Sequence, residues 1–174
     1  MNYRVLTVLR ILFVLGLVAF VQSVNALTLE EQRKLYENAK KALQDGRVTA
    51  FLAMADQLQD YPLYPYLRYN YLSPRLYKVK PGEIQAFIRE NNDFPLIDTL
   101  RTRWLRHLAK TGQWETYLEN YTPQKDPELQ CFELQARMKT GNRIYLLEDI
   151  RSVWLSGKSL PQQCDPAFAL LYKS

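Results

Sequence analysis

The stretch that most constrains the fold is Asp60–Leu72, which holds five tyrosines and two prolines in thirteen residues. A helix that begins near either proline loses nothing by the missing N–H, because first-turn donors have no partner within the helix. Large side chains then lie on different sides of that helix: Leu63, Leu67 and Tyr71 on one, and Tyr66, Tyr69 and Leu72 on another. A helix that is apolar on several sides needs neighbours on several sides, which predicts stacked helical hairpins.

An alternative role for these tyrosines is a platform on which sugar rings stack. We favour packing, because tyrosines at helical spacing most often bury the ring and keep the hydroxyl at the boundary. The stretch is therefore interpreted as structural.

The rest of the chain repeats the helical spacing of apolar residues. Thr28 to Glu31 is a capping box, and the helix that follows ends at Asp45-Gly46. Further apolar faces predict helices at Val48 to Leu58, Pro81 to Ile88, Ile97 to Leu108, Trp114 to Tyr121, Leu129 to Ala136, and Leu147 to Trp154. No segment alternates with period two, so no sheet is expected. The irregular spacing of the turns predicts an all-α superhelix, a degenerate helical-hairpin solenoid rather than a tetratricopeptide array.

Two strings of residues carry a family resemblance. They are Asp60-Tyr61-Pro62-Leu63-Tyr64-Pro65-Tyr66-Leu67 and, later, Val153-Trp154-Leu155-Ser156-Gly157-Lys158-Ser159 with Cys164-Asp165. Their order and spacing resemble the N-terminal part of the soluble lytic murein transglycosylases. The resemblance implies that residues 27–174 are the N-terminal part of an α-superhelical (U-type) domain, which in that family closes into a ring. The motif residues Tyr61 to Leu67, Trp154 and Gly157 are expected to be structural.

The resemblance also implies a reaction. Members of this family cleave the glycan strands of peptidoglycan without water and leave a 1,6-anhydromuramoyl end. One carboxylic acid, in a Glu-Ser pair followed by Gly-Leu-Met-Gln, acts as general acid and then base in a lysozyme-like domain further along the chain. Neither string occurs here. No catalytic residue is assigned, and the chain is expected to be a truncated segment that is inactive alone.

Residues 1–26 are predicted to be a signal peptide. Arg4 and Arg10 supply the positive region, an apolar core follows, and small residues precede a cleavage site between Ala26 and Leu27. A membrane anchor needs about 20 apolar residues, and Arg10 interrupts any extension upstream. We therefore expect export to the periplasm without a stable membrane anchor.

The charge of the chain indicates little about its partners. The signal segment holds two of the 23 basic residues and no acidic one, so its removal lowers the net charge from +5 by two. This small net positive charge permits attraction to an anionic polymer such as a cell wall. It does not provide the clustered basic stripe of a nucleic-acid-binding protein, and no nucleic-acid partner is expected.

Cys131 and Cys164 are the only cysteines. An exported protein meets an oxidising compartment in which such a pair usually bridges, so we predict a disulfide. Two buried free thiols are the alternative. A zinc site is not expected, because His107 is the only histidine and the cysteines are far apart in sequence.

No other group of residues indicates catalysis or cofactor binding. His107 lies among arginines on a predicted helix and is interpreted as a surface or boundary residue. Paired carboxyls are typical of glycoside hydrolysis, but Glu30-Glu31 is expected in a first helical turn, where acids favour the helix dipole. Glu148-Asp149 is expected mid-helix beside Arg151, on a solvated face. We predict no metal and no cofactor.

Two functions remain for this sequence. The first is the non-catalytic segment of a periplasmic lytic transglycosylase, which positions the enzyme on peptidoglycan glycan strands and is completed by further helical and catalytic domains. The second is an autonomous periplasmic helical-repeat adaptor that binds a protein partner. An adaptor is expected to end in a polar capping helix, whereas Phe168, Leu170, Leu171 and Tyr172 give an apolar end.

Overall fold

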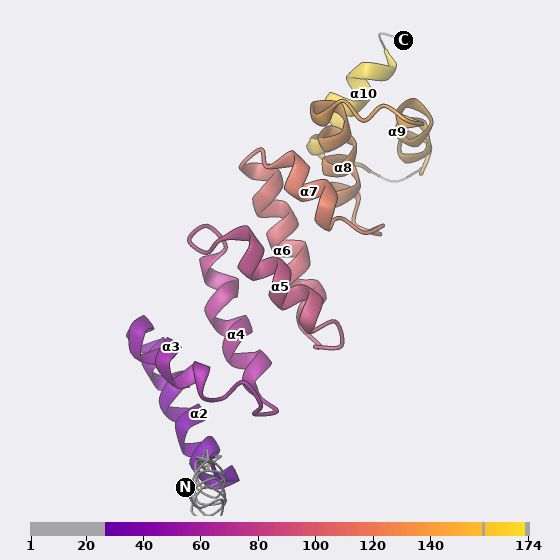
Figure 1. The fold of residues 1–174 in the computed structure, drawn as a ribbon. Coiled ribbons are helices and arrows are strands. Elements are labelled where there is room, and N and C mark those ends of the chain that lie inside the picture. The colour runs from indigo at the N-terminus through magenta and orange to yellow at the C-terminus, as the bar shows by residue number, and fades with distance from the viewer. Residues whose placement is uncertain (1–26, 158, 173–174) are drawn as a thin grey trace, which may run out of the picture.

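The computed structural model describes residues 27–157 and 159–172, and every regular element in those ranges is helical. The α-helices are α2 (Leu29–Gln44), α3 (Val48–Asp56), α4 (Tyr64–Leu72), α5 (Pro81–Glu90), α6 (Ile97–Lys110), α7 (Trp114–Asn120), α8 (Pro127–Thr140), α9 (Leu146–Trp154) and α10 (Asp165–Leu171), with the 3-10 helices η1 (Ser73–Arg75) and η2 (Gln162–Cys164). They follow one another along a long axis, from α2 and α3 at one end to α10 at the other (Figure 1). The predicted all-α stack is confirmed.

The helix ends follow from local sequence signals. At the start of α2 the Thr28 hydroxyl accepts a hydrogen bond from the Glu31 N–H, and the Glu31 carboxylate accepts one from the Thr28 N–H at 2.8 Å. This is the predicted capping box. Gly141 ends α8 with φ of +79°, in the left-handed region that glycine adopts without steric cost.

Helix α4 lies between two separate apolar clusters. Leu67 is fully buried in a cluster with residues of α2 and α3, such as Ala39 and Phe51. Leu72, on another side of α4, is fully buried in the central cluster formed by α5 to α8. The helix that carries the tyrosines therefore has apolar neighbours on both sides and joins two parts of the stack.

Aromatic contacts extend from α4 to both neighbours. Tyr71 stacks on Phe51 of α3 with ring centroids 5.3 Å apart. Tyr66 meets Phe94 edge-on, with centroids 4.8 Å apart. Leu63 was expected on the buried side with Leu67, but it is 41% exposed, because α4 begins at Tyr64 and leaves Leu63 in the preceding turn.

A third cluster lies at the C-terminal end, where α8, α9 and α10 meet. It contains the disulfide between Cys131 of α8 and Cys164 of η2, whose Cα atoms are 4.8 Å apart. Within this cluster Phe168 is buried and meets Trp154 edge-on at 4.7 Å. Phe168, one of the residues of the apolar C-terminal end, therefore belongs to a core cluster and is not exposed.

Helix α9 also differs from its predicted orientation. Leu146 and Ile150 are buried, whereas Trp154 is 46% exposed and Leu147 only partly covered. Glu148 and Asp149 lie in the first turn of α9 rather than mid-helix. Helix α9 thus turns a different face to the core from the one that its sequence pattern indicated.

Candidate functional site

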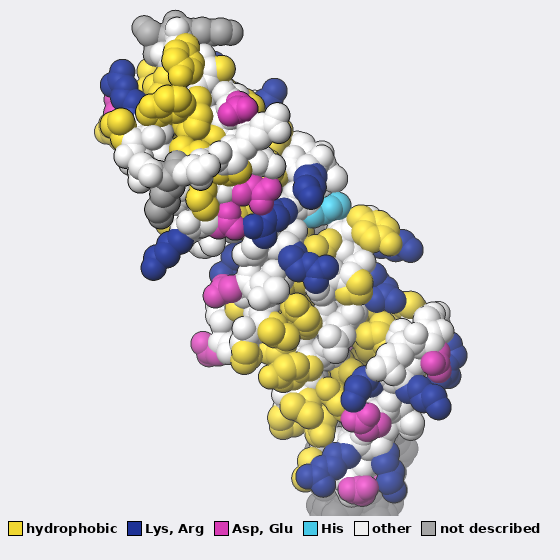
Figure 2. Space-filling view, turned by 180° about the vertical axis from the view of Figure 1, so that it is seen from behind, with side chains coloured by type: hydrophobic (Ala, Val, Ile, Leu, Met, Phe, Trp, Pro, Cys, Tyr) yellow, Lys and Arg dark blue, Asp and Glu magenta, His cyan; other side chains and the backbone are white. Residues whose placement is uncertain are grey.

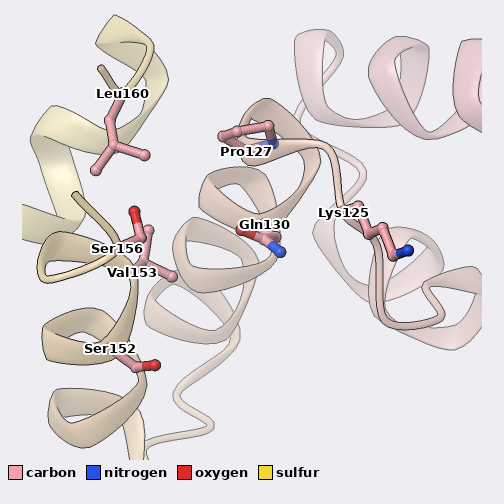
Figure 3. A pocket seen from close by; sticks show the side chains of 7 residues that line it. All are labelled: Lys125, Pro127, Gln130, Ser152, Val153, Ser156 and Leu160. Carbon is pink, nitrogen blue, oxygen red and sulfur yellow. The ribbon is translucent and has the colours of Figure 1, made fainter. Parts of the chain in front are cut away.

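A cleft opens between α8 and α9. It consists of two adjoining cavities of about 330 and 290 Å³ that share Gln130, Ser152 and Val153 in their walls. Figure 3 shows the first cavity, which is lined by Lys125, Pro127, Gln130, Ser152, Val153, Ser156 and Leu160. The second cavity continues along α8 past Glu133 and Arg137 and reaches Tyr121 at the end of α7. We call this space the α8–α9 cleft.

The first turn of α8 is anchored on α6. The Asp126 carboxylate caps α8 by accepting a hydrogen bond from the Glu128 N–H at 2.9 Å, and Pro127 occupies the first turn. The Arg106 guanidinium of α6 donates to Asp126 at 2.5 Å and to Glu128 at 2.6 Å. These contacts fix the position of the first turn of α8, and α8 forms one wall of the cleft.

Arg137 ties the two walls of the cleft together. One nitrogen of its guanidinium lies 2.7 Å from the Asp149 carboxylate of α9 and 3.4 Å from the Glu133 carboxylate of α8. The other terminal nitrogen donates to the Ile144 carbonyl in the connection between the helices. Only 11% of the Arg137 side chain is exposed. An arginine so buried is stable only with such partners, and it holds α9 in place.

Glu133 is the most unusual acid of the cleft. Burial raises the pKa of its carboxyl, and Asp149 raises it further, while the Arg137 guanidinium opposes both. The 3.4 Å contact with Arg137 is long for a charge-assisted hydrogen bond. Glu133 therefore keeps acceptor capacity toward the cavity that it lines.

One acid of each tandem carboxylate pair has a structural partner. Glu31 belongs to the capping box of α2. Asp149 binds Arg137 of α8, and with 51% of its side chain exposed it also lies on the solvated face that the sequence predicted. Among the described residues no group of three or more histidine, cysteine or acidic side chains could hold a metal ion. His107 lies on α6 and is partly covered.

The residues of the two motif strings lie in different parts of the stack. Tyr61 and Leu67 are buried in the N-terminal cluster. Between them Tyr64 and Pro65 are partly covered, whereas Pro62, Leu63 and Tyr66 are exposed. Trp154 and Gly157 lie at the end of α9, where Gly157 has φ of +68°. The strings therefore lie at two separate positions in the stack and do not form one site.

The predicted cleavage site lies at the edge of the described residues. Ala26 and the signal segment before it are outside them, and Leu27 is the first residue described. No helix in the described ranges is long and apolar enough to cross a membrane.

Sequence reasoning missed the cleft, although part of its pattern was present. Gln130, Glu133 and Arg137 follow one another on α8 at spacings of three and four residues, which places them on one face. The facing residues Asp149 and Ser152 come from α9, and their approach depends on tertiary packing. The pattern on α8 therefore indicated a polar face, but it did not indicate that α9 packs opposite that face.

The fold defines a class of protein, a helical-hairpin superhelix, and comparison with known proteins defines the family. No protein-family model matches the chain. The soluble lytic murein transglycosylase of Salmonella typhimurium is 33% identical over 156 residues, which are 88% of this chain and 24% of the relative. That of Escherichia coli is 32% identical over 82% of this chain and 22% of the relative.

Solved structures agree with this relationship. The lytic transglycosylase of Pseudomonas aeruginosa, solved as an inactive mutant, superimposes with a TM-score of 0.69 and 39% identity over 82% of this chain and 24% of that protein. The 70 kDa soluble lytic transglycosylase of Escherichia coli gives a TM-score of 0.70 and 32% identity over 84% of this chain and 24% of its own. The chain belongs to the soluble lytic murein transglycosylase family and spans about a quarter of the length of these relatives.

Proposed function

We propose that this chain is the N-terminal, non-catalytic superhelical segment of a periplasmic soluble lytic murein transglycosylase and positions the enzyme on peptidoglycan. The family activity is the non-hydrolytic cleavage of glycan strands to 1,6-anhydromuropeptides. The observation that supports the proposal is the superposition of 82–84% of this chain on 24% of solved lytic transglycosylases. A shared fold at this identity supports a shared role for the segment.

Further helical and catalytic domains are the proposed partners of the segment. The relatives are about four times as long as the matched region. At the C-terminal end Trp154, Leu155 and Tyr172 are 46%, 77% and 77% exposed. Figure 2 shows hydrophobic side chains gathered on the surface at that end of the molecule. Exposed apolar surface of this kind favours a neighbouring protein element.

Binding to isolated cell-wall sacculi tests the positioning role. The exported protein should sediment with sacculi, and it should do so less at high salt, since its net positive charge is attracted to an anionic polymer. An unrelated helical protein of similar charge is the control. Retention no greater than that of the control would contradict the proposal.

The periplasmic location is tested separately. Intact-mass analysis of the exported protein should give a chain that begins at Leu27. A mature species that still contains Arg10 would contradict cleavage of the signal peptide and leave the chain attached to the membrane.

An autonomous adaptor that binds a protein partner is the second candidate. The exposed Ile144 and Tyr145, 71% and 73% accessible in the connection between α8 and α9, favour a contact with protein. Sequencing the DNA beyond the codon for Ser174 separates the two. An in-frame continuation that encodes Glu-Ser and Gly-Leu-Met-Gln supports the transglycosylase segment.

A further inference from the structure

Several polar groups in the α8–α9 cleft have no partner within the described residues, and two of them, the hydroxyls of Ser152 and Ser156, belong to exposed side chains. Neither Ser152 nor Ser156 makes a side-chain hydrogen bond within the described chain. Figure 3 shows Ser152 extending from α9 toward α8, which carries Gln130. The Gln130 amide donates to the Gln124 carbonyl, so its own carbonyl oxygen is left as an acceptor. The cleft thus offers hydroxyl groups and an amide oxygen to a ligand.

The buried charges of the cleft favour a ligand without a carboxylate. Arg137, its one buried cation, is already held by Asp149, Glu133 and the Ile144 carbonyl. Lys125 is exposed at the rim and forms no ion pair in the described chain. Glu133 remains as a largely covered acceptor, with 19% of its side chain exposed. A buried carboxylate with spare lone pairs favours a ligand that is rich in hydrogen-bond donors.

The cleft also has apolar walls. Val153 and Leu160 face the first cavity, and Pro123 and the Tyr121 ring face the second. Tyr121 stacks on the buried Tyr117 with centroids 5.7 Å apart, which fixes the orientation of its ring. A site with apolar walls and a few placed polar groups is typical of small-ligand binding, and both cavities lie near the lower limit of about 300 Å³ for such sites.

We propose that the α8–α9 cleft is a saccharide subsite, which takes an uncharged, polyhydroxylated sugar unit. Glu133 accepts hydrogen bonds from sugar hydroxyls, Ser152 and Gln130 complete the polar contacts, and the apolar faces of the ring lie against Val153 and Tyr121. A sugar unit matches both the polar and the apolar residues of the cleft, because it carries hydroxyls at its edge and C–H groups on its faces. The inference rests on the proposed function and adds the place on the segment where a glycan is held.

Titration of the exported protein with tri-N-acetylchitotriose, followed by amide NMR shifts, tests the subsite. Saturable shifts should appear at Gln130, Glu133 and Ser152. Glu133→Gln keeps the shape of the side chain but removes its charge, and it should weaken binding about tenfold, since hydrogen bonds to charged groups are the stronger ones. Ser152→Ala should weaken binding severalfold. Glu115→Gln, an exposed acid of α7 outside the cleft, should change nothing.

Other outcomes would overturn the inference. These are the absence of saturable shifts at the cleft in millimolar sugar, and unchanged affinity in both cleft variants. Shifts at the cleft with a synthetic stem peptide but not with the sugar would assign it to a peptide instead. Sacculus binding is measured separately. If the protein binds sacculi but does not bind chitotriose at the cleft, the subsite is wrong and the proposed function is still supported.

Discussion

Leu67 shows how much of the stack depends on single side chains. It lies on α4 and is fully buried against α2 and α3, in the cluster that contains Phe51 and Leu58. Leu67→Ala should lower the free energy of unfolding by about 2 to 5 kcal/mol, because it removes buried methyl groups and leaves a cavity. Thermal and urea denaturation measure the change.

The chain offers a matched control for this substitution. Leu63 immediately precedes α4 and is 41% exposed, so Leu63→Ala should shift stability by no more than about 0.5 kcal/mol. If Leu67→Ala is neutral while sacculus binding is lost, the tyrosine-rich helix is a binding platform rather than a packing element.

Tyr117 should make the free energy of unfolding depend on pH in the alkaline range. Its side chain is fully buried and its hydroxyl donates to the Leu129 carbonyl at 2.7 Å. Burial, the largest cause, raises the pKa of the phenol well above its ordinary value of 10.0. Above pH 10 the unfolded chain releases this proton and the folded chain keeps it, so stability falls as pH rises, by about 1.4 kcal/mol per pH unit.

Replacing Tyr117 by phenylalanine should have two measurable effects. At neutral pH Tyr117→Phe should cost about 0.5 to 1.5 kcal/mol, because one buried hydrogen bond is lost. Between about pH 10 and pH 11 its stability should fall less steeply than that of the parent protein. Urea unfolding at a series of pH values measures both effects. Equal slopes for the two proteins would show that Tyr117 already ionises in the folded state.

At the scale of elements, the disulfide ties the last helices to the rest of the stack. Cys131 on α8 and Cys164 in η2 are separated by 33 residues, and closing such a loop stabilises the chain by about 4 kcal/mol in the chain-entropy model. The exported protein should therefore melt at a lower temperature after reduction. Thiol labelling of the denatured, non-reduced protein should find no free thiol.

The double variant Cys131→Ala, Cys164→Ala is the control for reduction. Its melting temperature should be low and independent of reductant. Labelling of both cysteines in the exported parent protein would show that the bridge does not form in the cell.

The helices that the sequence predicted best are those with explicit end signals. Helix α2 has its capping box and α8 its left-handed glycine. Helix α9 was predicted from Leu147, Ile150 and Trp154, of which only Ile150 is buried. The helix begins after Tyr145, a non-glycine residue in the left-handed region with φ of 53°. No local signal marks such a start, and the contact between Arg137 and Asp149 that accompanies it joins residues of different helices.

At the scale of the whole molecule, the described residues form a stack without a common core. Its buried apolar residues form a cluster around α2 and α3, a central cluster and a C-terminal cluster. In such an arrangement each helical pair is stabilised mainly by its neighbours. Damage to one end should therefore propagate through shared elements such as α4, which contributes Leu67 to one cluster and Leu72 to the next.

At this scale we also predict that the exported chain has no lytic activity on peptidoglycan. Cleavage without water needs a protonated carboxylic acid held at the scissile oxygen. Glu133 is the first acid to test, because burial raises the pKa of its carboxyl. The Arg137 guanidinium, 3.4 Å away, favours the ionised form, and an ionised Glu133 can accept a hydrogen bond from a sugar but cannot protonate a leaving group.

Incubation of the protein with purified sacculi, followed by mass spectrometry, measures this directly. We expect no anhydromuropeptides above a control without protein, while an active lytic transglycosylase assayed in parallel should release them. Product that Glu133→Gln abolishes and Glu115→Gln leaves unchanged would place the chemistry in the α8–α9 cleft. Glu133 would then have to be protonated in the complex, and release of product should increase as the pH falls toward the raised pKa of its carboxyl.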